Sequence, residues 1–172
     1  MKFNLFNRKV HYWASIVVAV PILIVIVSGL LLQTKKQFVW IQPPELRGAG
    51  KNPSVSLPQI LEISRGIPEA EIESWDDINR LDVRPARGML KVWAKNNWEI
   101  QIDTETGAIL QTAYRRSDII ESIHDGSFFH DNVKMLIFLP SGIALLLLWL
   151  TGMYLFVLPI WIRRRRKIVK SP

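Results

Sequence analysis

The chain has 172 residues and a formal net charge of +7, and 49% of its residues are hydrophobic. This length predicts one or at most two domains, and the hydrophobic share alone is not unusual for a soluble protein. Because the chain has no cysteine, disulfides, iron–sulfur clusters, thiolate zinc sites and covalently attached c-type haem are excluded.

Two long apolar segments organise the chain. Residues 10–34 and 135–162 contain no charged residue, and at about 1.5 Å per residue each is long enough to cross a hydrocarbon core of roughly 30 Å. Two segments cannot close a β-barrel, so we predict two transmembrane helices, at residues 10–34 and 134–162. The first segment is too long for the apolar core of a signal peptide and lacks a small-residue cleavage site, so we expect it to remain as a span.

The charged residues predict the orientation of the chain. The tails, residues 1–9 and 163–172, carry nine positive charges and no negative charge, whereas all fifteen acidic residues lie between Glu45 and Asp131. The positive-inside rule places both tails in the cytoplasm and the middle segment on the other side of the membrane. Since the middle segment is nearly neutral, with 13 basic against 15 acidic residues, the basic tails indicate anionic lipid head groups as partners and argue against nucleic acid.

The middle segment is predicted to be a linker followed by a small α+β domain. Residues 35–55 contain proline and glycine clusters, which are typical of an exposed connector. A domain is expected over residues 56–133. It begins with a short amphipathic helix, in which Ser56 and Gln59 form a capping box and which Gly66 ends.

Beyond this helix the apolar period changes to two, which is typical of antiparallel strands with one face toward solvent. A weaker pattern at residues 71–75 predicts a further strand. Hairpin turns are expected at Asn96-Asn97 and at the loop that ends in Gly107. From Ser117 the pattern returns to a helix that leads back to the membrane. The main strands are expected around residues 80–84, 90–94, 98–103 and 108–112.

The three histidines are the candidate ligands, because imidazole binds haem iron and transition metals without help from cysteine. His11 lies inside the first apolar segment, where an ionisable residue is costly and is a functional candidate; alternatively, its ring reaches water or lipid phosphate at the head groups. His124 and His130 do not share a helix face, so their spacing does not favour one metal bound by both. His130 is kept as a candidate metal ligand, and the alternative is two interfacial histidines beside an aromatic pair. No serine or acidic pair stands in a pattern typical of a hydrolytic site.

Several separate motifs occur in a characteristic order. They are Arg8-Lys9-Val10-His11, Pro21 and Ser28-Gly29-Leu30 in the first apolar segment, Ile100 to Gly107 in the strand region, Ile123-His124-Asp125-Gly126 after it, and Ser141-Gly142 and Leu150-Thr151-Gly152 in the second apolar segment. Through these motifs the chain resembles the PepSY-associated transmembrane helix family over nearly its whole length. The resemblance implies two membrane helices with a periplasmic PepSY domain of the α+β class between them.

The resemblance also implies a cofactor. Larger relatives with four spans include inner-membrane ferric and ferrisiderophore reductases, in which helix histidines hold b-type haem. By this similarity His11 and His124 are candidate axial ligands of haem b, and Gly29, Gly142 and Gly152 are candidate helix-packing positions. Because the chain has two spans and the two histidines are expected near opposite ends of the membrane, a haem-bound form would need a homodimer or a partner subunit.

Two function classes follow from these expectations. In the first, the protein binds haem b and transfers electrons across the membrane; the electrons come from a partner or a quinol, because the sequence has no flavin or nicotinamide motif. In the second, it is a non-catalytic accessory or scaffold subunit of a larger membrane complex, docked through aromatic-rich helices that include Trp149 and Trp161. A third idea, protease inhibition, is suggested only by the family name, because no rigid inhibitory loop can be identified.

Overall fold

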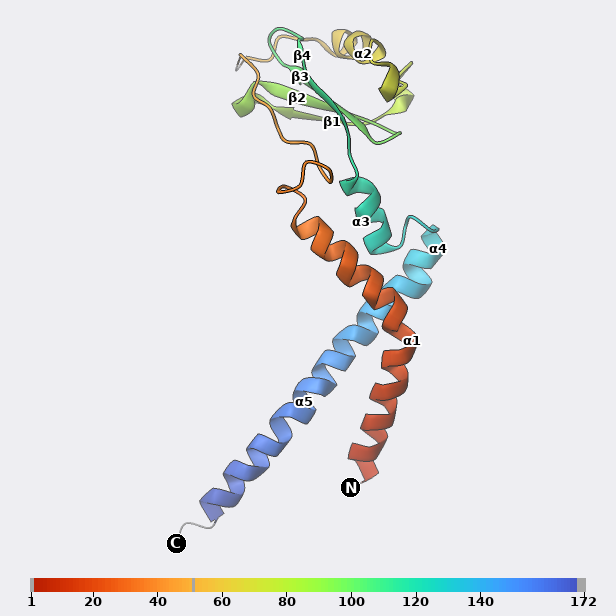
Figure 1. Cartoon of the computed structure of the whole chain (residues 1–172), viewed down its shortest axis with the longest axis vertical. Helices are drawn as coiled ribbons and strands as arrows, with labels where there is room; N and C mark the ends of the chain where they lie inside the picture. Colours follow the sequence, from red (N-terminus) through yellow and green to blue (C-terminus); the bar gives the residue numbers. More distant parts are fainter. Residues whose placement is uncertain (1, 51, 170–172) are drawn as a thin grey trace. The chain divides into compact units, whose positions relative to one another are not determined.

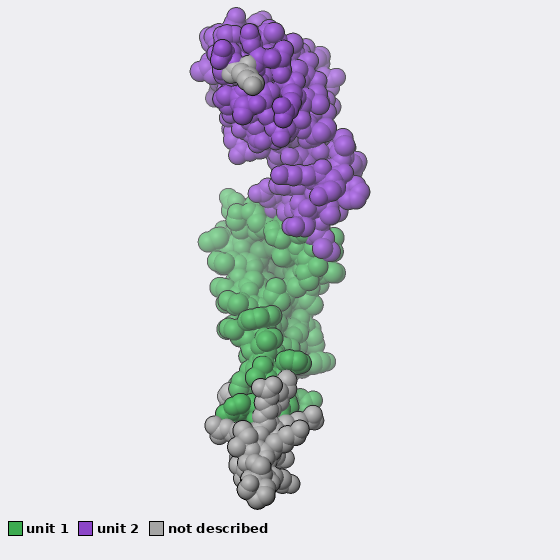
Figure 2. Space-filling model, turned by 90° about the vertical axis from the view of Figure 1, so that its left-hand side faces the viewer, with its two compact units in different colours: residues 1–29, 122–172 green, residues 30–121 purple. Residues whose placement is uncertain are grey.

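The computed structural model describes residues 2–50 and 52–169 (Figure 1). The chain divides into two compact units, one made of residues 1–29 with residues 122–172 and the other of residues 30–121 (Figure 2). The first unit is a pair of long helices, and the second is built around a four-stranded sheet.

The helix pair has the length and composition of two membrane spans. α1 runs over Lys2–Gln33, and the second helical run consists of α4 (Asp131–Val133), a π-helical turn (Lys134–Phe138) and α5 (Leu139–Val169). Within them, Arg8–Gln33 and Asp131–Pro159 are long and apolar enough to cross a membrane. The two predicted spans are therefore helices. α1 begins before the predicted start, and the second run extends beyond both predicted bounds.

The second unit contains one antiparallel sheet with the strand order β1-β2-β3-β4. Its strands are β1 (Ile78–Arg84), β2 (Met89–Ala94), β3 (Trp98–Asp103) and β4 (Ile109–Tyr114). Asn97 has φ of 70° and Gly107 has φ of 74°, so both predicted hairpin turns contain the left-handed residue that their sequences indicated.

One face of the sheet carries the apolar core. α2 (Leu57–Arg65) begins with the predicted capping box of Ser56 and Gln59 and packs on this face (Figure 1). Along each strand, side chains of this face alternate with side chains of the polar face. A one-residue shift in pairing would move the core residues to the other face, so their burial fixes the register of the sheet. The buried core residues are Ile60, Ala70, Ile72, Leu90, Val92, Ala94, Ile100 and Ile102.

The further strand predicted at residues 71–75 is wrong. This region forms two 3₁₀ turns, Pro68–Ala70 and Trp75–Asp77, with Glu71 at φ of 52° between them. The carboxylate of Asp77 accepts hydrogen bonds from the backbone N–H groups of Glu73 and Ser74. Those N–H groups would otherwise be available to a strand ladder, so local side-chain bonding replaces pairing here.

The opposite face of the sheet is also covered, and this corrects two predictions. Four polar residues that alternate with the core, Lys91, Glu99, Gln101 and Asp103, are each at most 2% exposed. The prediction of one solvent-facing side is therefore wrong for β2 and β3. The covering segment is residues 41–50, which the sequence predicted to be part of an exposed linker.

Backbone groups of this connector meet the polar side chains directly. The N–H of Leu46 donates to Oε1 of Gln101 at 2.9 Å, and Nε2 of Gln101 donates to the carbonyl of Pro44 at 2.9 Å. The N–H of Ala49 donates to the carboxylate of Asp103. Proline and glycine predict irregular backbone correctly, but irregular backbone can be buried when side chains satisfy its polar groups.

Backbone hydrogen bonds also hold the two ends of this unit together. The carbonyl of Ile41, which is buried, accepts hydrogen bonds from the N–H groups of Arg116 and Ser117 at 3.1 and 2.9 Å. α3 (Ser117–Asp125) begins at this point. The segment that enters the unit and the segment that leaves it are thus bonded to each other.

Candidate functional site

His124, near the end of α3, lies against α1. Its Nδ1 is 3.0 Å from Oγ of Ser28. A Cβ added at Gly29 would lie only 3.3 Å from Cε1 of the imidazole. Gly29 therefore leaves the space that this ring occupies, whereas its role in helix packing stays a prediction.

The hydrogen bonds of Ser28 favour one tautomer of His124. The Ser28 hydroxyl donates to the carbonyl of Ile24, one turn earlier in α1. Since a hydroxyl has one proton, its oxygen can only accept toward the imidazole. This favours a neutral ring that donates from Nδ1 and carries its lone pair on Nε2, the nitrogen that can bind a metal.

His11, on α1, has the same kind of contact with a hydroxyl of α5. Its Nδ1 is 3.4 Å from Oγ1 of Thr151 in α5. Thr151 donates its proton to the carbonyl of Leu147 at 2.9 Å, so its oxygen also accepts from the ring. His11 thus presents Nε2 as well, although the longer distance makes this hydrogen bond weaker than the one at His124.

The two histidines form separate sites in one chain. His11 and Ser28, the partner of His124, are 17 residues apart on α1. At 1.5 Å per residue this separates the two imidazoles by on the order of 25 Å along the helix. One chain therefore cannot bring both rings to a single iron. The same conclusion was expected from the sequence.

The turn after His124 is held by charge and by a glycine. The carboxylate of Asp125 accepts hydrogen bonds from the N–H and hydroxyl of Ser127 and pairs with Lys134. Gly126 has φ of 83°, and a Cβ there would lie 2.4 Å from the ring of Phe138. The Asp125-Gly126 part of the motif is thus structural, and it orients the end of α3 that carries His124.

The electrostatics of this turn keep Asp125 charged. Partial burial acts to raise the pKa of Asp125, but the hydrogen bonds from Lys134 and Ser127 outweigh burial and lower the pKa to about 2. The ion pair that holds the turn therefore persists at every physiological pH.

His130 has a different environment from the other two histidines. Its Nδ1 accepts a hydrogen bond from the N–H of Asn132 at 3.1 Å, so the side chain caps α4. Within the part of the chain that the structure describes, no three His, Asp or Glu side chains gather into a group that could hold a metal ion. The metal-ligand prediction for His130 stays a prediction.

The other two predicted packing glycines face open space. A Cβ at Gly142 or Gly152 would meet nothing within 4 Å, so neither position is required for contacts inside the described chain. Any packing role for them would involve another molecule.

Ser28 and Thr151 contact the two candidate histidines, and sequence reasoning missed both. Each lies in a quoted motif, but neither was given a role, because a hydroxyl in a membrane helix can satisfy itself on the preceding turn. One signal was available. Both residues directly precede a glycine, in Ser28-Gly29 and Thr151-Gly152, within otherwise apolar segments.

Comparison with known proteins identifies the family of the chain. The model of the family described as "PepSY-associated TM region" matches residues 8–171. The chain belongs to this family. Its two membrane helices and the four-stranded antiparallel sheet between them fit the PepSY-associated layout. The chain has no significant match among curated proteins or solved structures.

Proposed function

We propose that this PepSY-associated membrane protein binds b-type haem through His11 and His124 and carries electrons across the membrane. The observation that supports this most directly is the shared tautomer. At both histidines a helix hydroxyl accepts from Nδ1–H and leaves the Nε2 lone pair for a ligand. Such outer hydrogen bonds orient histidine ligands and raise their basicity in metal and haem sites.

The residues present fit an axial-ligand role. Both rings are partly buried, and each is held by a side chain on another helix, so their orientation is fixed before any ligand arrives. Haem, when bound, supplies one-electron redox chemistry. The chain contributes the imidazole nitrogens, the hydroxyls that orient them and an apolar surrounding that excludes water.

Each site needs a second axial ligand from another chain. Because the two histidines lie on the order of 25 Å apart, six-coordinate ligation requires a homodimer or a partner subunit. In a dimer, paired His11 residues would serve one site and paired His124 residues the other. The electron donor would be a partner protein or a quinol.

A second candidate function is that of an accessory or scaffold subunit in a larger membrane complex. The exposed Trp149 and the open surfaces at Gly142 and Gly152 favour it, because they leave room for another helix to approach. This role requires no ligand at either histidine.

Absorbance spectra of the detergent-purified full chain distinguish the two functions. The protein is produced in cells supplied with haem precursor, and oxidised and dithionite-reduced spectra are compared. We expect a sharp reduced α-band of b type that weakens in His11→Ala and His124→Ala. His130→Ala is the matched control, because His130 caps a helix and should leave the band unchanged. A folded, colourless protein would favour the accessory function.

We further propose that the chain lies in a bacterial inner membrane with both tails in the cytoplasm, because the tails carry nine positive charges and no negative charge. The cysteine-free sequence allows a clean test. In intact cells, a membrane-impermeant maleimide should label Glu71→Cys and leave Lys167→Cys unlabelled. The reverse pattern would invert the orientation.

A further inference from the structure

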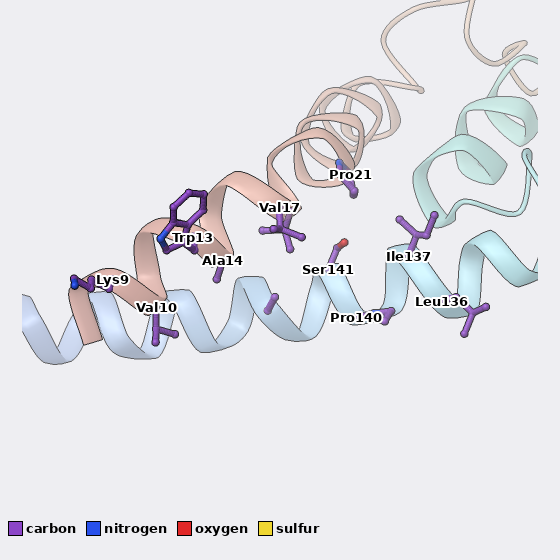
Figure 3. Close-up of a pocket in the computed structure, with 12 residues that line it drawn as sticks. Lys9, Val10, Trp13, Ala14, Val17, Pro21, Leu136, Ile137, Pro140 and Ser141 are labelled. Carbon is purple, nitrogen blue, oxygen red and sulfur yellow. The ribbon is translucent and has the colours of Figure 1, made fainter. Parts of the chain in front are cut away.

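An open groove runs between the two long helices of the first unit. It has a volume of about 750 Å³, and 12 residues of α1 and of the helical run from Leu136 to Ala144 line it (Figure 3). Val18 and Ser141 are buried at its floor, whereas Val10 and Trp13 are exposed at its rim. The groove is therefore a surface feature of the helix pair that faces lipid.

The sequence explains why the helices leave this space. Pro21 cannot donate a backbone hydrogen bond to the preceding turn, and proline inside a helix bends it. Ala14, Ser141 and Ala144 also line the groove, and their small side chains leave the volume between the helices unfilled. Both features follow from residue size and backbone chemistry.

The lining combines an apolar channel with a single charge. Lys9 is the one charged residue among the lining residues, and it lies at one end of the groove, while Leu136 and Ile137 lie at the other (Figure 3). An elongated molecule with an anionic head and an apolar tail matches this distribution. Lys9 is placed next to the apolar segment, where basic residues attract anionic lipid.

The length of the groove identifies the class of molecule more closely. From Lys9 to Pro21 it covers 12 residue steps of α1, which is about 18 Å at 1.5 Å per residue. Half of a hydrocarbon core of roughly 30 Å is about 15 Å. The groove thus begins at a head-group cation, and its α1 side alone covers about the depth of one lipid leaflet.

We propose that this groove binds one anionic phospholipid from the leaflet on the side of the chain termini. The phosphate pairs with Lys9, one acyl chain lies along Ala14, Val17 and Pro21, and Trp13 lies at head-group depth, where tryptophan is favoured. This site does not include either candidate haem ligand, so it stands independently of the proposed function.

A second copy of the chain fits the groove less well. An apolar partner helix would leave Lys9 facing a surface without a counter-charge, whereas the phosphate of an anionic lipid supplies one. The charge therefore favours lipid.

Native mass spectrometry of the full chain tests the site. The protein is released from detergent after incubation with equal amounts of phosphatidylglycerol and phosphatidylcholine, and bound lipids are counted. We expect the wild-type chain to retain phosphatidylglycerol in preference. Lys9→Gln should lower this preference about fivefold, the contribution of one basic residue near an anionic surface. Arg8→Gln is the matched control, because Arg8 is adjacent but does not line the groove.

A second pair of variants tests the apolar channel. Ala14→Phe should fill the groove and reduce the retention of both lipids, whereas Val20→Phe, at an exposed position outside the groove, should not. The proposal is overturned if the wild-type chain shows no preference, or if Lys9→Gln and Arg8→Gln act equally, which would indicate diffuse attraction. If the mass spectra show a dimer without bound lipid, the groove would be assigned to a second copy of the chain.

Discussion

The hydroxyl of Ser28 fixes the His124 ring through one hydrogen bond, so its removal is the smallest change that tests the ligand geometry. Ser28→Ala leaves Nδ1–H without its acceptor, and loss of such an outer partner costs about 10–100-fold in affinity at comparable sites. We expect haem titration of the detergent-solubilised protein to show weakening in this range. Ser15→Ala is the control, because Ser15 also donates to the preceding turn, at His11 O, but its hydroxyl does not bond an imidazole ring.

Substitution by alanine is expected to change stability in opposite directions at Gly126 and Gly142. Gly126→Ala forces a left-handed residue and a clash with the Phe138 ring, and each of these effects typically costs about 1–3 kcal/mol. Gly142→Ala adds a methyl group in open space within a helix, so it should be neutral or stabilising by up to about 1 kcal/mol. Thermal unfolding in detergent measures both. Equal effects at the two positions would contradict the turn geometry.

At the scale of elements, the polar face of the sheet is held by a buried charge network. Glu99 accepts from Arg115 at 2.6 Å and lies 3.6 Å from Lys91, and all three side chains are buried. Glu99→Ala leaves two cations without this partner, and breaking a buried pair typically costs about 3–5 kcal/mol. Glu62→Ala, at an exposed ion pair, should change the free energy of unfolding by less than about 0.5 kcal/mol.

The contact between Asp103 and the connector (residues 41–50) makes the stability of this unit depend on pH. Hydrogen bonds from the N–H groups of Thr106, Ala49 and Glu105 lower its pKa from 3.8 to about 2. The unfolded chain therefore binds a proton more readily, so this contribution to stability is complete above about pH 4 and is lost as the pH falls toward 2. Acid unfolding followed by circular dichroism should show a smaller slope in this window for Asp103→Asn. An unchanged slope would exclude Asp103 as its source.

Regular elements were predictable from the sequence, whereas irregular contacts were not. Apolar runs and period-two alternation predicted the two spans and the four strands, because burial of side chains sets those periods. The connector at residues 41–50 was predicted to be exposed, since proline and glycine report backbone irregularity but not which surface covers it. The roles of Ser28 and Thr151 required the structure, because a hydroxyl partner far along the sequence leaves no periodic signal.

At the scale of the whole molecule, the described chain places its two candidate ligands at different depths along α1: His11 lies on α1 itself, and His124, on α3, contacts Ser28 of α1. The hydroxyl at each histidine is in place without any partner. The second ligand is what a single chain lacks, so assembly with another copy or another subunit would control cofactor binding. Haem content should therefore depend on protein concentration if the protein forms a homodimer.

The haem content of four forms of the full chain tests the central claim most directly: the wild type, His11→Ala, His124→Ala and the double variant. If each histidine serves its own site, each single variant should retain about half of the wild-type haem per chain and the double variant none. Full haem content in the double variant, with the protein folded, would contradict the assignment of these histidines as ligands.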